Sequence, residues 1–134
     1  MVHSGGCRCG AIRFSASADP HFASICHCDD CRRASGAPML AFVGFYRRDV
    51  TFSGSDEQLY GEGSVRRSFC ATCGTPIAYR DEQLPDQIFF VLGAMDEPGR
   101  YPPTHEGYVS ERLPFVHLND ELPSFPGVSV RRPD

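Results

Sequence analysis

The residues of this sequence best suited to chemistry are its seven cysteines, which occur in three short clusters. The densest is segment 26–31, CHCDDC, where Cys26, Cys28 and Cys31 bring three thiols close together. Two pairs lie far from it in sequence, namely Cys7 with Cys9 and Cys70 with Cys73. Neighbouring cysteines are poorly placed to bridge one another, and packing gives no reason to cluster them. The odd number of cysteines and the C-x-C and C-x-x-C spacings therefore predict zinc sites.

The seven thiols divide naturally into four and three. The first and last pairs together would supply four thiolates, which is the closed ligand set of a structural zinc. The central cluster would supply three and leave one position for water or substrate, as catalytic zinc does. We therefore expect two zinc ions per chain, one structural and one catalytic. An alternative joins the last pair to the central cluster, which would leave Cys7 and Cys9 without partners.

A histidine could instead close the central site and make both ions structural. His27 lies between two of the ligands, so in an extended segment its side chain points to the opposite face. The sequence leaves four others as possible fourth ligands, namely His3, His21, His105 and His117. An open site predicts an enzyme, whereas a closed site predicts a zinc-stabilised binding module.

An open zinc position can hold a substrate thiol and remove its proton at neutral pH. Three cysteinates give the site a formal negative charge, so zinc would act as a template and thiol activator rather than as a strong Lewis acid. Arg32 and Arg33 directly follow the cluster and could bind substrate carboxylates, since guanidinium groups pair well with them. The alternative is that both arginines belong to an exposed helical turn and contribute little.

The elements that must position these residues are mainly strands. Alternating or continuous apolar runs predict strands over residues 10–15, 38–45, 50–52, 65–69, 75–79 and 87–92, and a short run over residues 22–25 leads into the central cluster. Segments 65–69 and 75–79 would form a hairpin with the last cysteine pair at its tip, where Gly74 supplies backbone freedom. Tyr79, Phe89 and Phe90 are expected in the core rather than in a substrate platform.

Little helix is expected. Residues 32–36 predict one or two helical turns, which Asp29 or Asp30 would cap and Gly36 would end. Between residues 98 and 126, six prolines predict irregular segments with one or two short strands that wrap the sheets.

Composition narrows the function classes. The net charge of −4 argues against a general nucleic-acid or anionic-membrane binder. No apolar run is long enough to span a membrane, and the first residues lack a basic head followed by an apolar run, so we expect a cytoplasmic protein. Hydrolase, kinase and dehydrogenase motifs are absent from the sequence.

Three segments in order carry a family resemblance: GCRCGAIRF at 6–14, CHCDDCRRASGAP at 26–38 and FCATCGTP at 69–76. Together they resemble the glutathione-dependent formaldehyde-activating enzyme family, which also contains the centromere protein V domain. The resemblance covers roughly residues 4–120 and leaves 121–134 as a tail of the single domain 1–134. It implies a zinc-stapled fold of packed antiparallel sheets.

The resemblance also implies roles for the cysteines and an activity. The family positions matching the outer pairs hold a structural zinc, and those matching Cys26, Cys28 and Cys31 hold the catalytic one. The implied reaction joins glutathione and formaldehyde to S-hydroxymethylglutathione and is classed as a carbon–sulfur lyase reaction in reverse. We expect a zinc-dependent enzyme that forms or cleaves such an adduct with a small-molecule thiol, glutathione being the named one. An enzyme of the same chemistry acting on a different thiol is the alternative.

Overall fold

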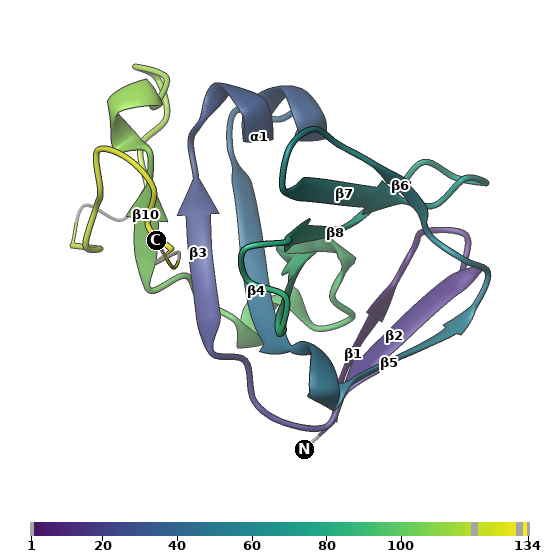
Figure 1. The fold of residues 1–134 in the computed structure, drawn as a ribbon. Coiled ribbons are helices and arrows are strands. Elements are labelled where there is room, and N and C mark those ends of the chain that lie inside the picture. The colour runs from purple at the N-terminus through teal and green to yellow at the C-terminus, as the bar shows by residue number, and fades with distance from the viewer. Residues whose placement is uncertain (1, 119–120, 131–132, 134) are drawn as a thin grey trace.

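Two β-sheets make up the chain, as Figure 1 shows for a computed structural model that describes residues 2–118, 121–130 and 133. The smaller sheet has the order β1 (His3–Gly6), β2 (Ile12–Ala16), β5 (Val50–Gly54). The larger has the order β10 (His105–Gly107), β3 (Phe22–Cys26), β4 (Leu40–Tyr46), β9 (Gln87–Val91), β8 (Pro76–Asp81), β7 (Val65–Phe69), β6 (Gln58–Tyr60). The expectation of a mainly β single domain is confirmed.

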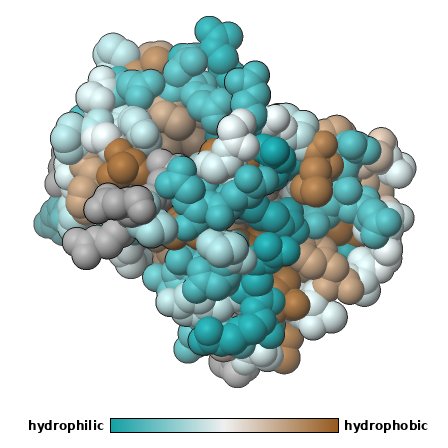
Figure 2. All heavy atoms as spheres, viewed as in Figure 1, coloured by the Kyte–Doolittle hydropathy of each residue, from teal (hydrophilic) through white to brown (hydrophobic). Residues whose placement is uncertain are grey.

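Helix is confined to short pieces. The α-helix α1 (Asp29–Ser35) follows β3 directly. The described residues also form four 3₁₀ turns: η1 (Arg47–Asp49), η2 (Leu92–Ala94), η3 (Pro98–Arg100) and η4 (Val109–Glu111). Within the described ranges, no helix combines the length and apolar character that crossing a bilayer requires. On the face drawn in Figure 2, hydrophilic residues cover much of the surface and apolar ones form small, separate groups.

The predicted strands are all present, the short run over residues 22–25 proves to be β3, and two further short strands carry no signal in the sequence. β1 (HSGG) and β6 (QLY) lack the apolar alternation that marks a half-buried strand, so only their tertiary partners reveal them. The expectation of antiparallel pairing needs one correction, because β10 runs parallel to β3 and makes the larger sheet mixed. Two parallel neighbours need a long connection between them, and here the connection from β3 to β10 contains the strands β4 to β9.

The two faces of the larger sheet support separate apolar clusters. Between the sheets, Phe14 of β2 stacks on Phe90 of β9 with ring centroids 3.8 Å apart. On the opposite face, Phe89 joins Leu40 and Phe42 in a second cluster that also contains Cys31. Successive residues of a strand point to opposite faces, so the neighbours Phe89 and Phe90 serve one cluster each.

A buried hydrogen bond between two side chains links β10 to the segment that carries the central cysteines. His27, directly after β3, places Nε2 2.8 Å from Oε1 of Glu106 on β10, and both side chains are almost fully buried. The backbone N–H of His27 also donates to the carbonyl of Gly107 at 3.1 Å. The position of β10 relative to the cysteine cluster is therefore set by side-chain and backbone bonds together.

Residues 121–130, which the sequence analysis treats as a tail, pack onto β10. Glu106 makes two backbone hydrogen bonds to this segment: its carbonyl accepts from the N–H of Phe125, and its N–H donates to the carbonyl of Pro123. The backbone N–H of Val109 donates to Phe125, and the hydroxyl of Ser110 donates to the carbonyl of Pro126. This segment therefore helps to hold β10 and η4 in place.

Replacing Glu106 by leucine should destabilise the fold, because it removes the acceptor of a buried histidine nitrogen and leaves that nitrogen unpaired. We expect a loss of about 1–3 kcal/mol in the free energy of unfolding, measured by urea denaturation. Glu106→Gln keeps an oxygen acceptor and should lose less. Glu97→Gln, at an exposed ion pair with Arg100, is the matched control and should change stability by under about 0.5 kcal/mol. Equal midpoints for wild type and Glu106→Leu would contradict this account of β10.

Candidate metal centres

The first and last cysteine pairs meet between the two sheets. Cys7 and Cys9 lie in the loop from β1 to β2, and Cys70 and Cys73 lie in the turn from β7 to β8. Their four Sγ atoms are all within 4.8 Å of one another. The Sγ atom of Cys9 lies 3.6 Å from that of Cys7 and 3.8 Å from that of Cys70. A regular zinc–sulfur tetrahedron has an edge of about 3.8 Å, so this group fits a four-thiolate zinc site.

Backbone turns shape this group. At the second turn, the N–H of Gly74 donates to the carbonyl of Cys70 at 2.8 Å, and the residue has a φ of 79°, which a glycine adopts without strain. The N–H of Ile12 donates to Sγ of Cys7 at 3.2 Å. The hydroxyl of Thr75 hydrogen-bonds to Cys73 and lowers the pKa of that thiol to about 5. The surroundings therefore favour the thiolate of Cys73, the form that binds metal.

The central trio forms a second, separate group. Cys26 ends β3, Cys28 is the residue that caps α1, and Cys31 lies in the first turn of that helix. Their Sγ atoms are also within 4.8 Å of one another. The backbone N–H of Cys31 donates to Sγ of Cys28 at 3.2 Å, so one ligand orients another. The structure thus groups the cysteines as four and three, and not as the alternative in which the last pair joins the trio.

None of the histidines joins the trio within the described part of the chain. His27 is bonded to Glu106, and His3 is bonded through its two ring nitrogens to Tyr101 and Asp19. The rings of His21 and His105 pack against aromatic side chains of the larger sheet. The Nδ1 atom of His27 is buried and has no hydrogen-bond partner among the described residues.

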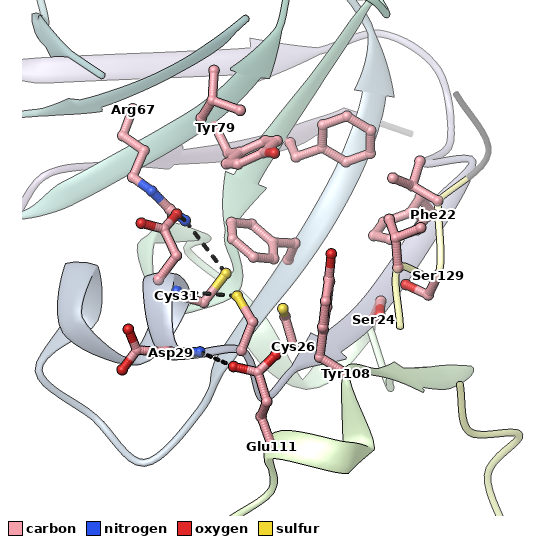
Figure 3. A pocket seen from close by; sticks show the side chains of 17 residues that line it. Phe22, Ser24, Cys26, Asp29, Cys31, Arg67, Tyr79, Tyr108, Glu111 and Ser129 are labelled. Atoms are coloured by element: carbon pink, nitrogen blue, oxygen red, sulfur yellow. Dashed lines mark hydrogen bonds and ion pairs between the residues drawn. The ribbon is translucent and has the colours of Figure 1, made fainter. Parts of the chain in front are cut away.

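A pocket of about 480 Å³ opens on the trio. Its apolar wall is aromatic, from Phe22, Phe42, Tyr79 and Phe89. Its polar lining comes from several elements, namely Ser24, Asp29, Asp30, Arg67, Tyr108, Glu111 and Ser129. Figure 3 shows the thiols of Cys26 and Cys31 on one side of this space and the aromatic rings opposite. Tyr79 and Phe89, expected only in the core, thus also face a place where a ligand could lie.

Arg67 is a pocket residue that the sequence analysis missed. Its side chain is 8% exposed, and Nη2 lies 2.6 Å from Oδ2 of Asp30 and 3.4 Å from Sγ of Cys31. Its guanidinium carbon lies 5.0 Å from the ring centroid of Tyr79. Strand alternation could have revealed it, because Arg67 shares a face of β7 with Val65 and Phe69. A cation on such a face needs a partner, and here the sulfur of Cys31 and the carboxylate of Asp30 supply it.

The predicted substrate-binding arginines lie on α1. Arg32 and Arg33 both pair with Oδ1 of Asp29, at 2.6 and 3.1 Å, and neither is among the residues that line the pocket. Gly36 ends the helix in a left-handed conformation, as expected. The start differs from the expectation: Cys28, rather than Asp29 or Asp30, caps α1, because its sulfur accepts the N–H that an aspartate would otherwise take.

Charge is shared unequally among the trio. The hydrogen bond with Cys26, followed by that with Cys31, lowers the pKa of Cys28 to about 2, and the charge of Arg67 contributes to this lowering. The contact with Cys28 raises the pKa of Cys26. Burial lowers the pKa of Arg67, but its bonds to Cys31 and Asp30 outweigh burial and raise it. The trio therefore holds negative charge beside a fixed cation, which suits a cationic ligand at its centre.

Comparison with known proteins finds a matching family model and related sequences. The family model for the glutathione-dependent formaldehyde-activating enzyme matches residues 2–111. A lyase of Schizosaccharomyces pombe, itself uncharacterised, is 29% identical over 77 residues, which are 58% of this chain and 56% of that protein. A Halomonas elongata protein, provisionally named a glutathione-dependent formaldehyde-activating enzyme, is 25% identical over 131 residues, covering 85% of this chain and 78% of that protein.

The fold has a counterpart among solved structures. A crystal structure of a Rhodobacter sphaeroides protein matches with a TM-score of 0.58 and 21% identity, covering 90% of this chain and 98% of that one. The family model spans most of the chain and includes all seven cysteines. The chain therefore belongs to the glutathione-dependent formaldehyde-activating enzyme family.

Proposed function

We propose that this protein is a zinc-dependent enzyme of the carbon–sulfur lyase type, which forms or cleaves an adduct between a thiol and an aldehyde such as S-hydroxymethylglutathione. The observation that carries the proposal is a pocket that opens on three clustered thiols in a member of this family. The names of the Halomonas and Schizosaccharomyces relatives support the same reaction class.

Two zinc ions per chain are part of the proposal. The four-thiolate group would hold a structural ion, because its spacing fits a closed tetrahedron. The trio would hold the catalytic ion, because its three thiols border the pocket. When bound there, zinc supplies the positive charge that keeps a substrate sulfur in the thiolate form.

The protein's own groups would bind and shield the reactants. Arg67 donates to Sγ of Cys31 and so tempers the negative charge of three cysteinates. The rings of Phe42, Tyr79 and Phe89 form a wall that excludes water, which protects an adduct that water would otherwise displace. Arg32 and Arg33, paired with the pocket residue Asp29, are the proposed partners for substrate carboxylates.

The proposed reaction is an addition. The sulfur lone pair forms a bond to the carbonyl carbon, the π bond of the aldehyde breaks, and its electron pair moves to oxygen. That oxygen then takes a proton and becomes the hydroxyl group of the adduct. Cleavage reverses each step, so one site serves both directions.

A different thiol is the second candidate substrate. Three of the polar lining residues, Asp29, Asp30 and Glu111, carry carboxylates, whereas Arg67 is the lining arginine and is already paired. A dianionic ligand such as glutathione would therefore depend on the arginines outside the lining. A thiol with fewer carboxylates would not need them.

Metal analysis tests the two roles. Cys28→Ser should reduce bound zinc from two ions to one and leave the fold intact, because serine still caps α1. Cys70→Ser should also lose one ion, but its unfolding free energy should fall by at least about 3 kcal/mol, because that ion joins the two sheets. Elemental analysis and urea denaturation measure the two effects. Two ions per chain in Cys28→Ser would rule out the trio as a site.

Activity tests the reaction itself. Purified protein mixed with formaldehyde and glutathione should speed adduct formation and exchange, followed by NMR, while metal-stripped protein and Cys28→Ser should not. Rates that match in all three samples would discard the catalytic proposal and favour the zinc-stabilised binding module.

The arginines should affect anionic thiols selectively. Replacing Arg32 and Arg33 together by glutamine should raise the KM for glutathione by roughly 3–10-fold, since each lost ion pair near the surface is worth about 1 kcal/mol or less. The KM for uncharged 2-mercaptoethanol should not change. Arg48→Gln, at a surface arginine over the Tyr46 ring, is the control. An unchanged KM for glutathione would remove both arginines from the binding site.

A further inference from the structure

Tyr108 has a backbone conformation that side chains rarely adopt. Its φ of 53° and ψ of 42° lie in the left-handed region, and among the described residues no other non-glycine has a positive φ. For an L-residue this costs roughly 1–2 kcal/mol, and it is unusual for one as bulky as tyrosine. Such conformations persist where the surrounding structure enforces them, and they concentrate at active sites.

The surrounding structure holds Tyr108 from both sides. Its backbone N–H donates to the carbonyl of Gly127 at 2.9 Å, and its own carbonyl accepts from Glu111 at 3.0 Å. The preceding residue, Gly107, ends β10 in register with Cys26 of β3. The tyrosine is therefore built directly onto the strand pair that carries a ligand of the trio.

The side chain points into the pocket. Tyr108 is one of the lining residues, and Figure 3 shows its ring rising beside Cys26, with the phenolic oxygen directed toward the space below the aromatic wall. The left-handed backbone turns this ring inward, because η4 begins at the next residue and takes the chain away. The strain thus places a hydroxyl group next to the thiol cluster.

The proposed addition needs a proton donor at the aldehyde oxygen, and few lining groups can serve. The three carboxylates of the lining act as acceptors when ionised. Arg67 is engaged with Asp30 and Cys31, and a guanidinium does not give up its proton. The hydroxyl of Ser24 donates to the carbonyl of Ile25 and is a far weaker acid than a phenol.

The lining contains two phenols, and their settings differ. Tyr79 belongs to the aromatic wall, where its ring lies 5.7 Å from that of Phe42 and under the guanidinium of Arg67. Tyr108 rises from the side of the pocket where Cys26 lies. The aldehyde carbon must lie in contact with the attacking sulfur, and its oxygen is one bond away, so the phenol that rises beside the thiols is the better placed donor.

We propose that Tyr108 is a catalytic residue of the reaction described above, on which this inference rests, and that its hydroxyl donates to the aldehyde oxygen. As the carbon–sulfur bond forms, the electron pair of the broken π bond moves to oxygen, which takes the phenolic proton. Water then returns a proton to the tyrosinate. In the cleavage direction, the tyrosinate removes the proton of the adduct hydroxyl group.

Tyr108→Phe keeps the ring and removes only the donor. Its kcat should fall by about 100-fold, the loss typical of a single proton donor or oxyanion partner. The KM for the thiol should stay within about twofold, and zinc content should not change. Tyr60→Phe, at an exposed tyrosine of β6 away from the pocket, is the matched control and should behave as wild type.

A second variant separates catalysis from backbone strain. Asparagine adopts the left-handed conformation more readily than tyrosine, so Tyr108→Asn should fold and bind zinc. Its kcat should be at least as low as that of Tyr108→Phe, because it also lacks the phenol. A Tyr108→Asn variant with wild-type kcat would overturn the assignment.

An NMR readout does not depend on turnover. The chain has five tyrosines, so protein labelled with ¹³C at the phenolic carbon should give five signals, and the one absent from Tyr108→Phe is that of Tyr108. This signal should shift when aldehyde and thiol are added together and much less with thiol alone. A shift of the Tyr79 signal with a static Tyr108 signal would contradict the proposal.

The outcomes distinguish this inference from the proposed function. A wild-type rate no higher than that of metal-stripped protein would overturn the function, and the role of Tyr108 with it. A catalytically active wild type with an equally active Tyr108→Phe would overturn the role of Tyr108 alone. A larger loss in Tyr79→Phe than in Tyr108→Phe would assign the donor to the other phenol.

Discussion

The meeting of four sulfur atoms between the two sheets is the constraint on which the rest of the structure depends. Two loops separated by some sixty residues of chain bring their thiols into contact distance. Thiolates this close repel one another unless a cation lies between them, so the arrangement makes sense as a metal clasp. The clasp links the smaller sheet, through the loop after β1, to the turn between β7 and β8. A metal bound there would contribute stability comparable to the net stability of a whole domain of this size.

The trio is built on the opposite principle, since its three thiols come from one short segment. A strand end, a helix cap and the first helical turn place them together within six residues of chain. Long-range contacts decide instead what surrounds them. The His27–Glu106 pair and the parallel register of β10 bring η4 and the segment 121–130 to the edge of the pocket. The candidate metal ligands of the pocket therefore come from one short segment, whereas its walls come from segments that are far apart in the sequence.

The sequence predicted those features that have local causes. Cysteine spacing indicated two groups, four and three, and the structure contains these groups. Apolar periodicity located six of the strands, because alternation follows from the pleat. It did not locate β1, whose residues are polar or glycine, or β6, which is only three residues long. The sequence also pointed to an aspartate as the cap of α1, since a sulfur acceptor is not part of the usual preference.

What the sequence by itself determined is therefore the mainly β class, the family and the division of the thiols, because each depends on residue type and spacing along the chain. Only the tertiary structure decided which side chains face the trio. Arg67 reaches Cys31 across 36 residues, and Tyr108 reaches the pocket because β10 pairs in parallel with β3. These neighbours depend on strand order and register, which the spacing of residues along the chain does not contain.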